Sequence, residues 1–338
     1  MIVFMPHPGL CGNERTIPSR ALPVPSTVSH EMQELAAQDG AEYLGLSTQQ
    51  QFDLMAKAGW NEAGTREQAA VVNQLAEKYR IKIYPREIGG VPCYFLEPEH
   101  VLSKNRNRLL VHLHGGAYTG GGGSGASWEA IRVSAISQMR TVAIDYRMPP
   151  EFPYPAAIDD AMSVWRKLVQ SNKSARLGVF GTSTGGAMTL LMVQRAKKER
   201  LPLPGAIFAG TPWADMSKTG DSYFTNAYVD NVTPTYEGGL QASALLYANG
   251  RDLKDPGLSP IYGDFTRFPP TLLVAGTRDL FLSNTVRVHV RLLESGTEAK
   301  LVVLEGQSHA QYLFSETAPE SHFVINQVVN FMDRHLSR

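Results

Sequence analysis

The chain has 338 residues, 43% of them apolar, and its 32 Lys and Arg residues balance its 32 Asp and Glu residues. A chain of this length can bury a large core, which favours one large α/β domain with an accessory piece, while the balanced charge argues against a nucleic-acid-binding surface or a polybasic membrane anchor. Its two cysteines, Cys11 and Cys93, are too few for a disulfide framework or a cysteine-based zinc site.

The N-terminus carries no recognisable targeting segment. The apolar run 1–5 is too short for the core of a signal peptide and is followed directly by Pro6. No stretch of 18 or more apolar residues occurs, so we expect no membrane span. These features predict a soluble, cytoplasmic protein, with an exported form made from an upstream start as the alternative.

The first part of the chain is predicted to be an irregular arm followed by helices. Residues 1–26 are rich in Pro and Gly, and Ser29 is placed to cap a helix over 31–37. Ser47 and Thr65 are each followed three residues later by Gln, as in a capping box, and predict two more helix starts. We therefore assign residues 1–80 to an N-terminal arm and cap helices that precede the first strand.

From residue 81 to residue 338, strand patterns alternate with helix patterns. The expected strands are 81–84, 91–96, 109–113, 141–144, 177–180, 206–209, 271–275 and 299–304. The expected helices lie near 126–138, 156–170, 185–198, 281–294 and 320–336. Several strand runs are continuously apolar, which is typical of parallel strands buried on both faces. The pattern predicts a mostly parallel, doubly wound eight-stranded sheet with helices on both faces.

One segment, 211–262, interrupts the alternation. It is polar, aromatic and rich in Asn and Asp, with a single helix pattern near 235–247. In an α/β sheet an insertion of this kind lies over the carboxyl ends of the strands, where ligands bind. We expect it to contribute to a cap over the catalytic domain 81–338.

A nucleophile motif lies between a strand and a helix. Gly181-Thr-Ser-Thr-Gly-Gly186 follows the apolar run 177–180 and precedes a helical pattern. A G-x-S-x-G sequence in this context is the tight turn that exposes the nucleophilic serine of α/β-hydrolases. Ser183 is therefore the predicted nucleophile; a glycine-rich turn without chemistry is the alternative reading of the motif taken alone.

A second glycine-rich loop follows the strand 109–113. His114-Gly-Gly-Ala-Tyr118 presents small residues whose backbone N–H groups can approach a substrate carbonyl. With the N–H of Thr184, those of Gly115, Gly116 and Ala117 form the predicted oxyanion hole. A phosphate-binding loop is the alternative, but no G-x-x-x-x-G-K-[ST] motif is present. We interpret His114 as a residue that organises the loop.

The remaining catalytic groups are predicted from chain order, which in this fold is serine, acid, histidine. Asp279 follows the strand 271–275, and His309 is the one later histidine in a loop after a strand, since His289, His322 and His335 lie in helical patterns. Asp264 and Glu305 are rival acids. Asp264 precedes its strand and Glu305 lies too close to His309 along the loop, so Asp279 is preferred.

Together these motifs resemble the hormone-sensitive-lipase-like esterases, bacterial family IV of the lipolytic enzymes. The resemblance covers most of residues 80–338. It rests on the motifs above and on Asp145-Tyr-Arg-Met-Pro-Pro-Glu151, Pro153-Tyr-Pro-Ala-Ala-Ile-Asp-Asp160, Ser259-Pro-Ile261 and Asp279-Leu280. It implies an α/β-hydrolase core, a helical cap built from the N-terminus and the insertion, and carboxylester hydrolysis with no cofactor. No H-E-x-x-H motif or Cys/His ligand spacing occurs, so we also expect no metal. The resemblance also implies that Asp145 and Arg147 serve structure near the floor of the site.

Two residues depart from the family pattern. Ala117 stands where a third loop glycine is usual, which leaves an N–H donor but restricts the backbone, and Thr184 stands where Ala is common after the serine. The predicted partner is a small-molecule ester, and the protein is expected to be a monomer or homodimer. Hydrolysis of lactones or amides on the same triad is the first alternative, and a non-catalytic binding protein the second. Four aromatic side chains are candidates to line the substrate pocket, with packing in the core as the equal alternative for each: Tyr118, Phe224, Tyr228 and Phe281.

Overall fold

The computed structural model describes residues 19, 21–40, 45–58 and 62–336. All eight predicted strands are confirmed: β1 (Ile81–Ile88), β2 (Val91–Pro98), β3 (Leu109–Leu113), β4 (Arg140–Ile144), β5 (Leu177–Thr182), β6 (Ala206–Gly210), β7 (Thr271–Gly276) and β8 (Ala299–Leu304). They form one sheet in the order β1-β2-β4-β3-β5-β6-β7-β8. β1, β2 and β4 pair antiparallel, and every pair from β4 to β8 is parallel. This is the mostly parallel α/β-hydrolase sheet that the sequence predicts.

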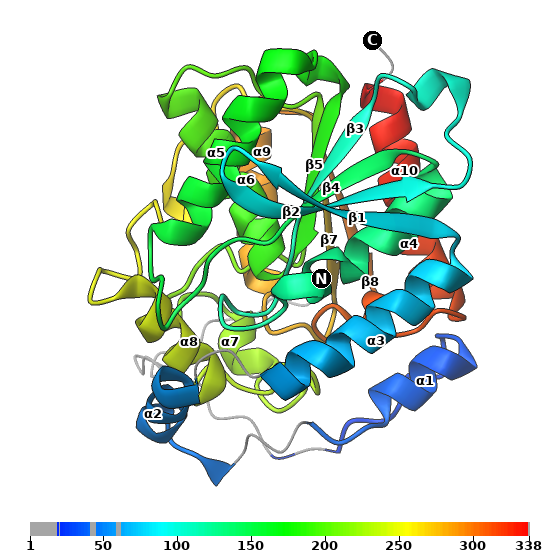
Figure 1. Cartoon of the computed structure of the whole chain (residues 1–338). Helices are drawn as coiled ribbons and strands as arrows, with labels where there is room; N and C mark the ends of the chain where they lie inside the picture. The colour runs from blue at the N-terminus through cyan, green and yellow to red at the C-terminus, as the bar shows by residue number, and fades with distance from the viewer. Residues whose placement is uncertain (1–18, 20, 41–44, 59–61, 337–338) are drawn as a thin grey trace, which may run out of the picture.

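Helices cover both faces of the sheet (Figure 1). The described helices, on the faces of the sheet and at its end, are α1 (His30–Ala36), α2 (Thr48–Ala58), α3 (Glu62–Lys78), α4 (Trp128–Ser137), α5 (Ala156–Ser171), α6 (Thr184–Lys198), α7 (Ser222–Thr225), α8 (Gly239–Ala248), α9 (Leu282–Glu294) and α10 (Pro319–His335). Short 3₁₀ helices occur at Ser103–Asn105, Gly123–Ser127, Ser174–Arg176, Pro260–Tyr262 and Gln311–Leu313. Among the described helices, none is long and apolar enough to cross a membrane.

Neighbouring strand residues supply two separate hydrophobic cores. Val179 belongs to the core beneath α5, α6 and α9, and the next residue, Phe180, belongs to the core beneath α4 and α10. Successive side chains of a strand point to opposite faces, so a continuously apolar strand feeds both cores. Burial on both faces fixes the central strands and, with them, the loops at their carboxyl ends.

Two predictions of helix position need correction. The helix expected to start at Thr65 begins at Glu62, because Glu and Ala are good helix formers and extend the helix back through Gly64 at a cost of only about 1 kcal/mol for that glycine. The insertion 211–262 contains the short helix α7 in addition to the predicted α8. The expected irregular arm over 1–26 lies largely outside the described residues, as does Cys11, whereas Cys93 is buried in β2.

The N-terminal helices and the insertion meet at the end of the sheet where the strands finish. The predicted capping box forms at Ser47, whose N–H donates to Gln50 Oε1 at 2.8 Å. Thr48 at the start of α2 then accepts the N–H of Gly238, just before α8, at 3.0 Å. The carbonyl of Leu35 in α1 accepts from Asn231 Nδ2 at 2.8 Å. α1 and α2 therefore contact the insertion, and Figure 1 shows both helices on the side of the sheet that holds α7 and α8.

Candidate active site

Ser183 occupies a strained turn between β5 and α6. Its backbone has φ 63° and ψ −123°, a conformation that non-glycine residues rarely adopt. The turn is held by the Ser183 N–H, which donates to the Gly210 carbonyl at 2.8 Å. A Cβ on either Gly181 or Gly185 would overlap the carbonyl oxygen of Leu113 in the neighbouring strand. The glycines of the motif are therefore required by the close approach of β3 to the turn.

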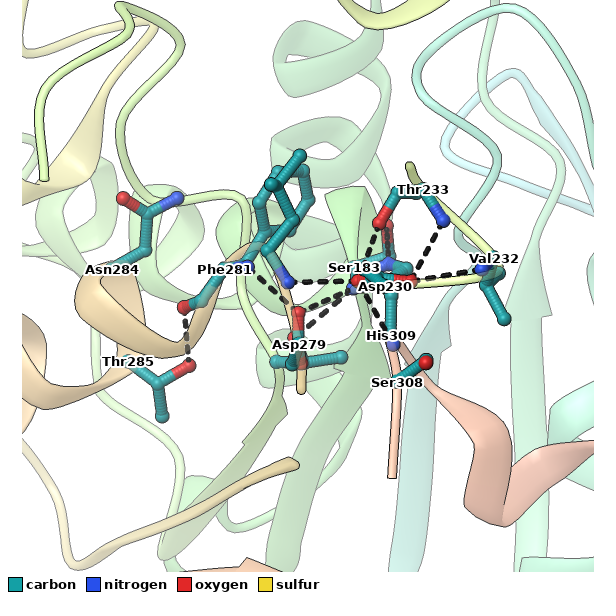
Figure 2. Close-up of polar contacts among 12 residues, drawn as sticks. Ser183, Asp230, Val232, Thr233, Asp279, Phe281, Asn284, Thr285, Ser308 and His309 are labelled. Atoms are coloured by element: carbon teal, nitrogen blue, oxygen red, sulfur yellow. Dashed lines mark hydrogen bonds and ion pairs between the residues drawn. The ribbon is translucent and has the colours of Figure 1, made fainter. Parts of the chain in front are cut away.

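A chain of hydrogen bonds joins Ser183 to His309 and Asp279 (Figure 2). Ser183 Oγ lies 2.9 Å from Nε2 of His309, and Nδ1 of His309 lies 3.2 Å from Oδ1 of Asp279. Asp279 is completely buried after β7, and His309 is nearly buried in the loop after β8. The strands β5, β7 and β8 are parallel, so their carboxyl ends bring the three residues to one edge of the sheet.

Further contacts fix the orientation of the Asp279 carboxylate. The Phe281 N–H donates to its Oδ1 at 2.7 Å, and the hydroxyl of Thr211 donates to its Oδ2. The same hydroxyl lies 3.1 Å from Nδ1 of His309. With Nδ1–H directed at the carboxylate, Nε2 is left as the acceptor that faces the serine hydroxyl. This arrangement can remove a proton from Ser183.

Charge near the imidazole favours its protonated form. Burial by itself lowers the pKa of His309, but the carboxylates of Asp279 and, more weakly, Asp230 raise it above its ordinary value. Burial and the neighbouring Asp279 raise the pKa of Asp230 to about 6. The site is therefore built to stabilise a positive charge on His309.

The two rival acids lie elsewhere. Asp264 is exposed and forms an ion pair with Lys197 at 2.7 Å, which holds the pKa of its carboxyl down at about 2. Glu305 is exposed just after β8, and among the described residues the hydrogen bonds and ion pairs of His309 do not include it. Asp279 is the carboxylate that hydrogen-bonds to the imidazole.

The loop after β3 carries backbone N–H groups next to the serine. Gly116, Ala117 and Tyr118 have φ values of 115°, 53° and 61°, so Ala117 takes the left-handed conformation despite its Cβ. The Gly116 carbonyl accepts the N–H groups of Thr119 and Gly120, each at 2.9 Å. Within the part of the chain that the structure describes, the N–H groups of residues 115–117 and of Thr184 have no hydrogen-bond acceptor. They are free to receive an oxyanion.

His114 has the contacts of a residue that organises this loop. Its ring stacks on Tyr146 with centroids 4.0 Å apart, and its Nδ1 lies 2.8 Å from the Gly115 carbonyl. The Tyr146 hydroxyl donates to the His114 carbonyl at 2.6 Å. Burial lowers the pKa of His114 to about 3, so the ring is neutral. Nearby, the predicted structural residues Asp145 and Arg147 bind the Gly123 N–H and the Asp160 carboxylate, respectively.

A cavity of about 480 Å³ opens above Ser183. Its wall combines both glycine-rich motifs with apolar side chains from α4, the insertion and the loop after β8. The main apolar contributors are Trp128, Val232, Leu240, Leu313 and Phe314. A second cavity of about 220 Å³ shares Ala117, Val232, Thr233 and Leu240 with the first and reaches Met55 of α2. The sequence did not predict these lining residues, because the pattern around each of them is compatible with a position in the core and with a position on the surface.

The four aromatic side chains proposed for the pocket wall are not among the residues that line this cavity. Phe224 and Tyr228 are 63% and 74% exposed. Tyr118 is buried in a stack on Tyr247 at 3.7 Å, and Phe281 packs its edge against the His309 ring at 4.7 Å. Tyr118 and Phe281 pack against other rings, and Phe224 and Tyr228 are exposed to solvent. No contact therefore supports the predicted role of these four side chains in lining the cavity.

A buried polar cluster lies beneath Ser183 and was not predicted. Glu129 of α4 accepts the Thr182 hydroxyl at 2.7 Å and lies 3.1 Å from Nε2 of His112. The Tyr312 hydroxyl lies 2.9 Å from Thr182 Oγ1. The cluster anchors the residue before Ser183. Among the described residues, no group of three or more His, Cys, Asp or Glu side chains is placed to hold a metal ion.

Comparison with known proteins gives a consistent result. The model of a family described as having the alpha/beta hydrolase fold matches residues 110–313. An acetyl-hydrolase of Streptomyces hygroscopicus is 27% identical over 68% of this chain and 77% of its own length. An ethyl acetate hydrolase of Pseudomonas putida is also 27% identical, over 67% of this chain and 73% of its own. The solved structure of esterase E25 is 37% identical, covers 96% of this chain and 99% of that one, and superposes with a TM-score of 0.88.

Proposed function

The chain belongs to the α/β-hydrolase family and is a carboxylic ester hydrolase, and from this premise we propose that it is an esterase of the hormone-sensitive-lipase-like group. In this proposal Ser183, His309 and Asp279 hydrolyse short- to medium-chain esters through an acyl-enzyme. The observation that carries this proposal is the continuous hydrogen-bond chain from Ser183 Oγ through the imidazole to Asp279 Oδ1, with links of 2.9 and 3.2 Å. The geometry matches the division of roles in Ser-His-Asp catalysis.

In the acylation half, Ser183 Oγ attacks the ester carbonyl carbon while His309 Nε2 takes the hydroxyl proton. The resulting imidazolium is stabilised by Asp279 at Nδ1, 3.2 Å away. The carbonyl oxygen becomes an oxyanion and is received by the N–H groups of Gly116, Ala117 and Thr184, with Gly115 beside them. The C–O bond to the alcohol then breaks as His309 Nε2–H returns its proton to the leaving oxygen.

In the deacylation half, His309 Nε2 removes a proton from water, which attacks the acyl carbonyl on Ser183 Oγ. The same N–H groups stabilise the second oxyanion. When this intermediate collapses, the proton passes from His309 to Ser183 Oγ and the carboxylic acid is released. Every proton therefore moves through one nitrogen atom.

The size of the site supports small substrates. The main cavity, about 480 Å³, falls in the range of small-molecule sites, about 300–1,000 Å³. Val232, Thr233 and Leu240 of the insertion line this cavity, and Met55 of α2 lines the adjoining cavity of about 220 Å³ together with them. This shared lining supports the proposed role of α2 and the insertion as a cap. A covered cavity keeps bulk water out while admitting the attacking water, and it limits the length of the acyl chain. The relatives named for acetyl and ethyl acetate hydrolysis are consistent with a short acyl group.

A panel of p-nitrophenyl esters from acetate to palmitate, run beside a γ-lactone and an anilide, tests the proposal. We expect turnover of acetate to hexanoate to exceed that of palmitate, and Ser183→Ala to reduce kcat by about 10⁴–10⁶ without loss of fold. Faster lactone turnover would move the activity to cyclic esters on the same triad. Turnover that survives in Ser183→Ala would exclude the proposed nucleophile.

A further inference from the structure

Asp230 is a fully buried carboxylate that the catalytic scheme above does not use. It lies in the insertion between β6 and β7, two residues before the cavity wall begins at Val232. Its side chain reaches the loops that carry Asp279 and His309, and Figure 2 shows it beside the imidazole. A buried charge is costly unless it is fully hydrogen-bonded, so the contacts that it makes are informative.

Five donors converge on this carboxylate. Oδ1 accepts the N–H groups of Val232 at 2.8 Å and Thr233 at 2.9 Å. Oδ2 accepts the Thr233 hydroxyl at 2.9 Å, the Leu280 N–H at 2.7 Å and the His309 N–H at 3.1 Å. One oxygen thus binds the cavity wall, while the other also binds two loops that are distant in sequence.

Oδ2 of Asp230 controls the spacing between the two loops that carry Asp279 and His309. Leu280 directly follows Asp279, and His309 is the base itself, so a single atom holds the backbone of both loops. The hydrogen bond between Asp279 Oδ1 and His309 Nδ1 depends on that spacing. We propose that Asp230 is a positioning residue of the esterase: it sets the Asp279–His309 geometry and couples it to the cavity wall at Val232 and Thr233. This inference rests on the triad proposed above.

The contacts also explain why the residue is an acid. An asparagine offers one oxygen and one NH₂ group, so either the pair Val232 and Thr233 or the pair Leu280 and His309 would face a donor instead of an acceptor. The negative charge has a second effect, because Asp230 adds to Asp279 in favouring the imidazolium form of His309. Asp279 and His309 are the ionisable groups that face Asp230 from the loops packed on it.

The test is Asp230→Asn in the full chain, with Asp252→Asn as the matched control. Asp252 lies in the same insertion and accepts the Lys254 N–H in a similar local turn, but it is exposed and distant from the site. We expect Asp230→Asn to lower kcat by about 10–100-fold, the range that a displacement of catalytic groups by a fraction of an ångström to an ångström produces. The control should keep the wild-type kcat.

A role in stability alone would leave the protonation of His309 unchanged, so the decisive readout is its pKa. The midpoint of the acid limb of kcat/KM, and of the pH titration of the His309 ring N–H followed by proton NMR, should move to lower pH in Asp230→Asn. Removal of a nearby anion makes the imidazolium less stable. Wild-type kcat together with an unmoved midpoint would overturn the inference.

A measurement on the wild type covers the case in which Asp230→Asn does not fold. The ¹⁵N-labelled amides of Val232, Thr233, Leu280 and His309 all donate to one carboxylate, so their shifts should move with a common midpoint as Asp230 takes up a proton. The Lys254 amide should not follow them. Independent midpoints would refute the shared contact. Failure of the esterase proposal is separate, because it appears as activity that survives in Ser183→Ala.

Discussion

The substitution Gly185→Ala tests why the turn that carries Ser183 requires glycine. A Cβ at this position would overlap the Leu113 carbonyl oxygen and lie 2.9 Å from the backbone carbon of His114. Both neighbours are backbone atoms, so no side chain can rotate away. Relief requires the turn or the end of β3 to move by roughly an ångström before ordinary contact distances return.

That displacement predicts two measurable losses. A shift of about 1 Å in a catalytic group costs about 10²-fold in rate, so kcat for p-nitrophenyl butyrate should fall by at least that factor. Overpacking costs about 1–3 kcal/mol, so the melting temperature followed by circular dichroism should drop by several degrees. Both effects come from the same overlap and should appear together.

Gly120→Ala is the matched control. Its Cβ would meet only the Gly116 carbonyl, at an ordinary 3.6 Å, although it lies in the glycine-rich loop of the same site. We expect a change in kcat of less than about 3-fold there, within the range of surface substitutions. If Gly185→Ala kept full activity and its melting temperature, the close approach of β3 to the Ser183 turn would not be what requires glycine.

Three further predictions follow from the site. His309→Ala should lower kcat about as much as Ser183→Ala does, because the two residues act as a unit, and Asp279→Asn should lower kcat by roughly 10⁴-fold. The variants of the two rival acids, Asp264→Asn and Glu305→Gln, should keep their activity. If one of them lost activity while Asp279→Asn kept it, the catalytic acid would have to be reassigned. Burial lowers the pKa of His309, but its carboxylate neighbours raise this pKa overall. Because His309 acts as a base only when it is neutral, kcat/KM should fall with decreasing pH through a midpoint above the ordinary histidine value of about 6.5. A midpoint below that value would contradict the proposed effect of the two carboxylates. Deletion of residues 1–60 should reduce turnover and increase binding of a hydrophobic dye, whereas a truncated protein with the full acetate rate and an unchanged chain-length preference would show that this segment is no cap.

The predictable part of the structure is the part that local chemistry encodes. Apolar runs predicted all eight strands, and several of these runs are continuously apolar, because a strand buried on both faces has few positions for a polar side chain. The Gly181 to Gly186 motif located Ser183 because the turn permits few residue types. Chain order then selected Asp279 and His309, and the structure brings these two side chains together with Ser183 through hydrogen bonds.

Other local patterns of the sequence are compatible with more than one structure, and for these no single prediction follows from the sequence. Phe224 and Phe281 are both aromatic residues near the insertion or the acid loop, yet the first is exposed and the second packs against His309. Thr65 fits a helix cap as well as a helix interior. The type of a residue indicates that its side chain favours burial or helix capping, but it does not indicate which neighbouring residues bury it or hydrogen-bond to it.

The contacts that complete the site were decided by tertiary structure alone. Asp230 is 79 residues from His309, and Glu129 is 53 residues from Thr182, so neither pair shares a motif or a period. Each is a buried carboxylate whose role depends on donors from separate loops, and those donors meet only when the parallel strands end at one edge of the sheet. The sequence by itself therefore determined the fold and the choice of Ser183, Asp279 and His309 as the proposed triad, because these follow from burial, turn sterics and chain order. The tertiary structure decided what holds the trio in place, because the cost of burying a charge can be offset only by partners that folding assembles.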